Sequence, residues 1–149
     1  MSDTKIVIIT PPPINIPEGM MGEDKEMAIE EANQWKKEGP RHKTYMSKKR
    51  YAEGLMSIAN EYADTGRVIG IDFWRALVEE KLKEDEEGSW EELENSGMWP
   101  GCGLIGAKSF DKGWFTDGLH LDRKGYAVLN RILVESVVGK WPELAPERL

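Results

Sequence analysis

Two short hydrophobic runs stand out from the polar parts of this chain and are its clearest β-strand candidates. The first, Lys5–Thr10, consists mainly of isoleucine and valine and is followed by three consecutive prolines. The second is Val68–Ile71. Short runs of β-branched residues are typical of buried strands, and proline cannot continue a strand because it lacks an amide hydrogen. We therefore predict two strands, the first ending before Pro11.

Helical spacing of hydrophobic residues predicts one helix between these strands and two after them. The first helix carries its hydrophobic positions at Tyr51, Leu55, Ile58, Ala59 and Tyr62. The second carries them at Trp74, Leu77, Val78 and Leu82, and the last at Val128, Leu129, Ile132 and Leu133. Gly66 is expected to end the first helix, and Asp72 and Asp122 are expected to cap the starts of the other two.

Two segments have weaker patterns. Residues 14–39 are charged and methionine-rich, and we interpret them as an insertion with one marginal surface helix around Ala28, Ala32 and Trp35. Residues 90–113 contain several glycines, tryptophans and a proline, and we predict a long loop there.

The order strand, helix, strand, helix predicts an α/β fold with parallel pairing through a right-handed crossover. No repeat or linker divides the chain, so we expect one domain over residues 1–149. Two strands are few for a parallel sheet, which usually has about 4–6 strands and helices on both faces. The pattern therefore supplies too few strands for an independent parallel sheet.

Composition limits the classes of partner. The net charge is −7 and the pI about 5.0, which argues against binding to nucleic acid. No hydrophobic run reaches the roughly 20 residues of a membrane span, and the first residues lack the apolar core of a signal peptide. A single cysteine, Cys102, excludes an internal disulfide. We expect a cytoplasmic protein.

The most informative chemical motif is Asp117-Gly118-Leu119-His120. A carboxylate three residues before a histidine can hold the imidazole ring, fix its tautomer and stabilise its charged form. We therefore expect a carboxylate oxygen of Asp117 within hydrogen-bond range of His120 Nδ1. The alternative is a simple turn, because Asp-Gly is a common turn pair.

Other candidate groups are less specific. Cys102 could pair with a histidine as a nucleophile, but nothing in the sequence indicates a lowered thiol pKa, and Ser109 lacks the sharp turn of a serine nucleophile. The two histidines, His42 and His120, are far apart, and we expect no metal site. No glycine-rich phosphate loop or dinucleotide motif is present, so no cofactor is expected.

The chain resembles the C-terminal part of the SGNH/GDSL hydrolases, most closely the isoamyl-acetate-hydrolysing esterases. The resemblance rests on the order of a strand, three prolines, a second strand and the Asp-Gly-Leu-His motif before a final helix. It covers the stretches 4–14, 50–74 and 114–149. It implies a flavodoxin-like three-layer fold, of which this chain would supply the last two parallel strands and their flanking helices.

The resemblance also implies roles for residues. Asp117 and His120 would be the orienting acid and the general base of small or short-chain ester hydrolysis. Residues beside them would line the substrate pocket: Pro13, Ile14, Trp114, Phe115 and Leu119. The family's Gly-Asp-Ser nucleophile motif and Gly-x-Asn-Asp segment are absent from the sequence.

We therefore expect a relative of ester hydrolases that is inactive alone because its nucleophilic serine is missing. The alternative is a non-catalytic remnant or an interaction subunit. For partners, we expect a small ester if the site is completed. We also expect self-association, or binding of a complementing N-terminal segment, through the Ile6–Ile9 edge.

Overall fold

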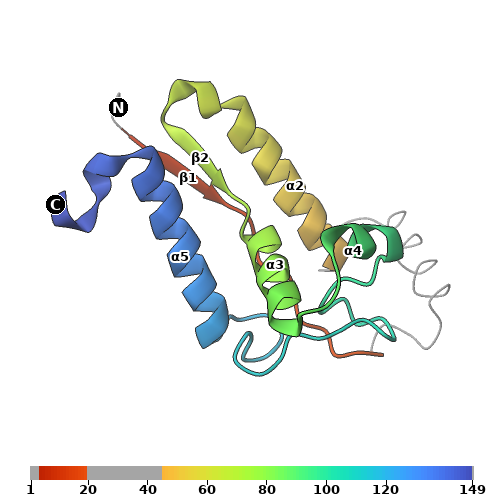
Figure 1. Ribbon diagram of the computed structural model, residues 1–149. Coiled ribbons are helices and arrows are strands. Elements are labelled where there is room, and N and C mark those ends of the chain that lie inside the picture. Colours follow the sequence, from red (N-terminus) through yellow and green to blue (C-terminus); the bar gives the residue numbers. More distant parts are fainter. Residues whose placement is uncertain (1–3, 20–44, 149) are drawn as a thin grey trace.

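The computed structural model describes residues 4–19 and 45–148 and contains a two-stranded parallel sheet. Strand β1 (Ile6–Ile9) pairs with β2 (Val68–Ile71), and Ile8 lies opposite Gly70 in the register. Figure 1 shows the strands between two long helices, α2 and α5. The predicted α/β class and the parallel pairing are confirmed.

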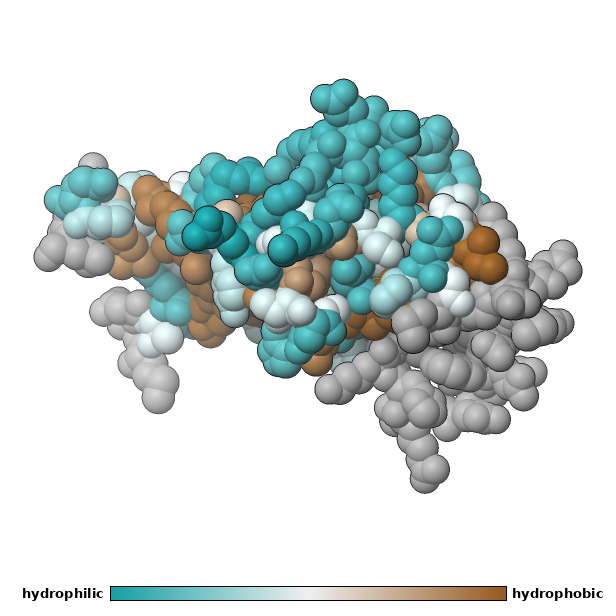
Figure 2. All heavy atoms as spheres, turned by 90° about the horizontal axis from the view of Figure 1, so that it is seen from below, coloured by the Kyte–Doolittle hydropathy of each residue, from teal (hydrophilic) through white to brown (hydrophobic). Residues whose placement is uncertain are grey.

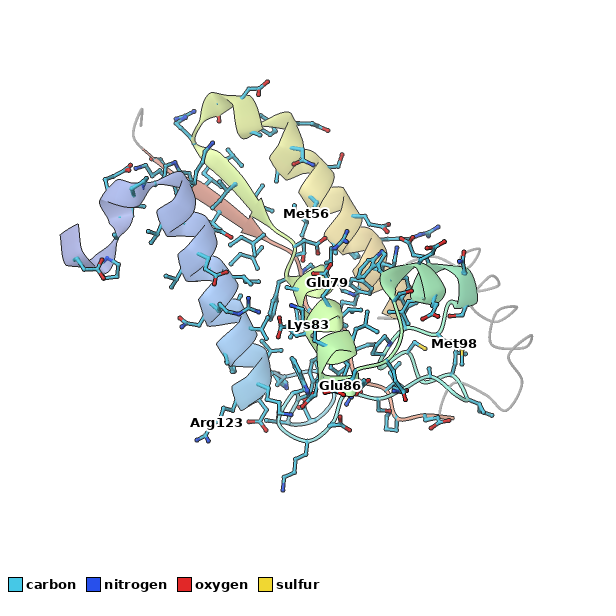
Figure 3. All side chains as sticks on the ribbon, in the orientation of Figure 1. Met56, Glu79, Lys83, Glu86, Met98 and Arg123 are labelled. Carbon is cyan, nitrogen blue, oxygen red and sulfur yellow. The ribbon has the colours of Figure 1, made fainter. Side chains whose placement is uncertain are left out.

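Helix α2 (Tyr45–Glu61) presents a different side to the sheet from the one that its hydrophobic residues predict. Ala52 and Ala59 are each only 2% exposed, whereas Tyr51, Ile58 and Tyr62 are 66%, 45% and 53% exposed. The cause is Gly70, where an added Cβ would lie 2.7 Å from the Ala59 Cβ and 3.0 Å from Met56. Figure 3 shows Met56 on the side of α2 that faces β2. The helix approaches the strand so closely that only small or flexible side chains fit between them.

The connection from α2 to β2 contains Gly66, which caps the turn after α2 and not, as predicted, α2 itself. A 3-10 turn, η1 (Ala63–Thr65), follows α2, and Gly66 ends it with a φ of 68°, where L-residues are disfavoured. The Gly66 carbonyl accepts a hydrogen bond of 3.0 Å from Trp141 Nε1, which ties this turn to the end of α5.

Helix α3 (Phe73–Asp85) begins at the carboxyl ends of both strands. Asp72 caps it by accepting from the Arg75 N–H at 3.0 Å, as predicted. Thr10 follows β1 and is 1% exposed; its Oγ1 accepts from the Trp74 N–H at 3.0 Å and donates to Asp72 Oδ1 at 3.3 Å. The end of β1 is thus fixed to the start of α3.

The predicted loop over residues 90–113 is wrong in its first part, which forms helix α4 (Trp90–Ser96). Ser89 and Glu92 form a capping box: the Ser89 hydroxyl accepts from the Glu92 N–H, and the Glu92 carboxylate accepts from the Ser89 N–H. Leu93 is the buried residue of α4. A seven-residue helix with one buried position shows no hydrophobic period, so the cap was the only sequence evidence for it.

Helix α5 (Arg123–Lys140) closes the fold and is followed by two 3-10 turns, η2 (Pro142–Leu144) and η3 (Pro146–Arg148). Its cap at Asp122, which accepts from the Arg123 N–H, is as predicted. Val128 is buried, and Leu129 and Ile132 pack against the same core. The partners in this core are Phe73, Leu77, Phe110, Trp114 and Phe115. A second core gathers Ile14, Ala52, Trp74, Val78, Leu93, Trp99, Cys102 and Ala107.

The predicted helix around Ala28, Ala32 and Trp35 lies outside the described residues. Within the described ranges, no helix is long and apolar enough to cross a bilayer.

Candidate active site

The Asp117–His120 motif lies at the tip of a tight turn between α4 and α5. The flanks of the turn meet where the Asp122 N–H donates to the Trp114 carbonyl at 2.8 Å, and Phe115 forms an antiparallel bridge with Leu121. At the tip, the Thr116 N–H donates to the His120 carbonyl at 2.9 Å. The buried side chains of Trp114 and Phe115 thereby anchor an exposed tip to the core.

Asp117 holds His120 through both of its carboxylate oxygens. Its Oδ2 lies 2.6 Å from His120 Nδ1, which is the predicted contact. Its Oδ1 accepts backbone N–H groups from Leu119 at 3.0 Å and from His120 at 2.8 Å. The carboxylate is therefore fixed by backbone hydrogen bonds, and the ring is fixed by the carboxylate.

The same contacts set the charge of Asp117. The His120 N–H, the His120 ring and the Leu119 N–H hold the pKa of the Asp117 carboxyl well below its usual range. An ionised carboxylate accepts the Nδ1 proton, so in the neutral ring the other nitrogen, Nε2, is the proton acceptor. This is the protonation state that a histidine general base requires.

Both side chains face solvent: that of His120 is 73% exposed and that of Asp117 is 54% exposed. Figure 2 views the molecule from the end at which this turn lies. Hydrophilic residues cover much of the described surface there, and hydrophobic ones appear between them. The dyad is thus open to an incoming group.

Asn15 fixes the turn from the segment that follows β1. Its backbone N–H donates to the Gly118 carbonyl at 2.7 Å. Its side-chain amide makes two hydrogen bonds to the backbone of Phe110, one donated and one accepted, each 2.9 Å long. Asn15 therefore connects the segment that follows β1 with Phe110 and with Gly118, the residue between Asp117 and His120.

A second set of contacts fixes the loop to α3. Lys81 is 2% exposed, and its Nζ lies 2.6 Å from both Asp85 Oδ1 and Asp111 Oδ2. Burial opposes the charge of Lys81, but its hydrogen bonds to Asp111 and Asp85 outweigh this and raise its pKa. One turn further along α3, Glu84 accepts from Trp114 Nε1 at 2.6 Å and pairs with Lys124.

The sequence interpretation did not identify Asn15 or Lys81 as site residues. Asn15 stands between prolines with no local partner, and its contact with Phe110 spans 95 positions. A buried lysine inside a charged helix looks like any surface lysine in sequence. The available indication was weak: an asparagine so close to prolines, where no regular structure can form, has to find its hydrogen bonds elsewhere.

The five residues assigned to a substrate pocket lie in two environments. Four are buried: Pro13 and Ile14 after β1, and Trp114 and Phe115 in the core with Phe110. Leu119, at the tip of the turn, is 39% exposed. Their role in binding a substrate stays a prediction.

The other candidate nucleophiles differ in their burial. Cys102 is buried, and burial raises the pKa of its thiol, which disfavours the reactive thiolate. Ser109 is half-buried. In the part of the chain that the structure describes, no three metal-binding side chains cluster as a metal site would require.

Neither of two cavities in the described part of the chain is lined by Asp117 or His120. A shallow cavity of about 450 Å³ between α3 and α5 is lined by Glu80, Lys83, Glu84, Trp114, Lys124, Ala127 and Val128. A smaller one of about 160 Å³ is lined by Lys49, Ala52, Glu53, Asp72, Trp74, Arg75, Trp90 and Glu94. The two basic residues that line the smaller cavity both have acidic partners, Lys49 with Glu53 and Arg75 with Glu79.

Comparison with known proteins gives no relative for this chain: no family model matches it, and neither does any curated protein or solved structure.

Proposed function

We propose that Asp117 and His120 are the acid and base of an SGNH/GDSL-type hydrolase of small or short-chain carboxylic esters. The observation that carries the proposal is the 2.6 Å contact between Asp117 Oδ2 and His120 Nδ1, in a carboxylate also held by two backbone N–H groups. A carboxylate that only ended a turn would need no ring contact. Further support is the position of the dyad beside the segment that follows β1, since ligands bind at the carboxyl ends of parallel strands.

In the proposed reaction a serine hydroxyl attacks the ester carbonyl, and His120 Nε2 takes the serine proton. Asp117 stabilises the imidazolium that forms. His120 then returns the proton to the leaving alcohol, and water releases the acid in a second step by the same route. Asn15 and Lys81 would act indirectly, by holding the loop that carries the dyad.

The nucleophile has to come from outside this dyad, since the sequence has no Gly-Asp-Ser motif. A strand that paired with β1 in parallel would end beside Asn15, at the same end of the sheet as His120. We propose that an N-terminal segment of this kind completes the site. The chain alone is then an inactive half of an α/β hydrolase fold.

Complementation tests this proposal. The chain is mixed with a separately produced segment that carries the first three strands of an SGNH esterase, including its Gly-Asp-Ser serine. Hydrolysis of a short-chain aryl ester should appear in the mixture and be lost when the segment's serine is replaced by alanine or when His120→Ala is used. A stable complex without activity, or activity that survives His120→Ala, would contradict the proposal.

A further inference from the structure

One side of the molecule is hydrophobic over both a strand and a helix. Backbone hydrogen bonds from the Ile6 and Thr10 N–H groups run to Arg67 and Ile71, so the alternate residues of β1, Val7 and Ile9, direct their N–H and C=O groups away from β2. No described residue extends the sheet beyond β1. The strand therefore offers an unpaired edge without the charge, bulge or internal proline that usually protects one.

Four hydrophobic residues of α2 and of the position just after it lie on the same side; three of them are exposed and Leu55 is half-buried. Tyr51, Leu55, Ile58 and Tyr62 follow one another at spacings of four, three and four, which places them on one helix flank. Around the helix axis, this flank lies about a quarter turn from the buried side with Ala52 and Ala59, against the direction in which the helix winds. In a right-handed crossover it therefore faces the outer edge of β1. The opposite flank, with Lys49 and Glu53, lines the cavity beside Asp72 and Arg75 and so faces away from that edge.

These two features form one surface, which we call the β1-edge surface: the outer edge of β1 and the flank Tyr51, Leu55, Ile58 and Tyr62. In a parallel sheet, paired residues point to the same face. Gly70 faces α2, so its partner Ile8 lies on the α2 face too, and so does Ile6, two residues before it. These two side chains join the two parts of the surface. Ile6 is 48% exposed.

The centres of the strand edge and of the helix flank lie at the same level. Gly70 pairs with Ile8, and Met56 and Ala59, between and beside Leu55 and Ile58, pack on Gly70. A two-fold axis perpendicular to the sheet, beside the outer edge of β1 at the level of Ile8, would therefore relate both parts of the surface to their copies in a second chain. It would pair Val7 with Ile9 of a second copy in antiparallel fashion, with their N–H and C=O groups facing each other.

The same axis would bring two α2 helices together. Because α2 contacts both strands, the helices of two copies would lie about two strand spacings apart, ~10 Å, which is a normal distance for packed helices. They would run antiparallel, with Tyr51 near Tyr62 of the other copy and the two central residues, Leu55 and Ile58, facing each other.

We propose that a second copy of this chain occupies the β1-edge surface, giving a symmetric dimer with a four-stranded sheet. The surface is self-complementary, which is what a two-fold interface requires. The antiparallel arrangement sends the two Asp117–His120 turns to opposite ends of the dimer. On the proposed function, a segment bringing a serine would compete with the second copy for the same edge.

Sedimentation velocity on the full chain over about 1–100 μM, combined with amide hydrogen exchange, tests this proposal. We expect a monomer–dimer equilibrium that Ile58→Lys weakens at least tenfold, whereas Asn60→Lys, at an exposed position on the polar flank of α2, leaves it unchanged. In the dimer the Val7 and Ile9 amides should be protected, and Ile58→Lys should release them. The Ile6 and Thr10 amides, which bond to the β2 side, should stay protected in both states.

Circular dichroism checks that Ile58→Lys is folded, and Tyr62→Lys, on the same flank, gives an independent variant. A monomer at all concentrations would overturn the proposal. If that monomer protects Val7 and Ile9, a segment of its own chain occupies the edge. A dimer that Ile58→Lys and Tyr62→Lys leave intact, with Val7 and Ile9 unprotected, would mean that copies associate through another surface and would also overturn it.

Discussion

The backbones of Asn15 and Gly118 are in direct contact. The Asn15 N–H donates to the Gly118 carbonyl at 2.7 Å, and a Cβ added at position 118 would lie 2.5 Å from the Asn15 carbonyl oxygen. Gly118 also has a φ of 82°, a conformation that other residues rarely adopt. The contact explains the glycine between Asp117 and His120: the turn can reach the segment after β1 only because position 118 carries no side chain.

Gly118→Ala should therefore separate the turn from Asn15. We expect a loss of about 1–3 kcal/mol in the free energy of unfolding, from backbone strain and the displaced hydrogen bond. Urea denaturation measures it. Gly54→Ala is a matched control, since a Cβ there meets nothing within 4 Å and the position lies inside α2; it should be neutral or stabilising. Equal effects of the two substitutions would refute the contact.

Lys81→Met should destabilise the chain because it keeps the hydrophobic stem but removes the ammonium group between Asp85 and Asp111. Breaking a fully buried ion pair costs about 3–5 kcal/mol, and we expect about 1–3 kcal/mol because the Asp111 side chain is 65% exposed. Lys83→Met is the control: Lys83 lies on the same helix (Figure 3), and its side chain is 68% exposed. It should change stability by less than about 0.5 kcal/mol. A Lys81→Met variant as stable as the control would show that the buried lysine does not hold the loop.

The pH dependence of stability should report the Asp117 contacts. Because the pKa of Asp117 is lower in the folded chain than in an unfolded one, its ionised form favours folding. That contribution is complete well above pH 4, the ordinary range of a carboxyl, and is lost as the pH falls through the folded value. The stability difference between the wild type and Asp117→Asn should thus be largest at pH 5–7 and shrink below pH 4. Urea denaturation of both proteins at pH 7, 5 and 3 measures this difference. The same stability difference at all three pH values would contradict the claim that ionised Asp117 stabilises the folded chain.

The chain alone should not act on esters. Short-chain aryl esters should be hydrolysed no faster than by His120→Ala, and a serine-reactive phosphonate probe should leave the chain unlabelled, because no nucleophile is supplied to the base. Mass spectrometry of the probe-treated chain checks this directly. Stoichiometric labelling that disappears in Ser109→Ala would instead make Ser109 the nucleophile.

Features encoded over a few neighbouring residues could be predicted from the sequence. The strands, the caps at Asp72 and Asp122 and the turn at Gly66 each depend on local backbone chemistry. The same holds for the Asp117–His120 contact, which spans three positions and needs only a tight turn. These features are present in the structure.

Features decided by distant partners could not be predicted. Helix α2 turns its alanines inward because Gly70 leaves no room for Tyr51 or Ile58, and nothing within the helix sequence reveals that. Asn15 and Lys81 depend on partners at Phe110 and Asp111, which the fold alone brings close.

The tautomer of His120 tests most directly the claim that Asp117 orients it as a base. Nitrogen-15 NMR of the neutral ring should show the proton on Nδ1 and none on Nε2 in the wild type, because the Asp117 carboxylate accepts from Nδ1. In Asp117→Asn this preference should weaken or reverse, whereas the spectrum of His42, the chain's other histidine, should stay unchanged. A wild-type ring protonated mainly on Nε2, or a tautomer ratio that Asp117→Asn leaves unaltered, would contradict the account.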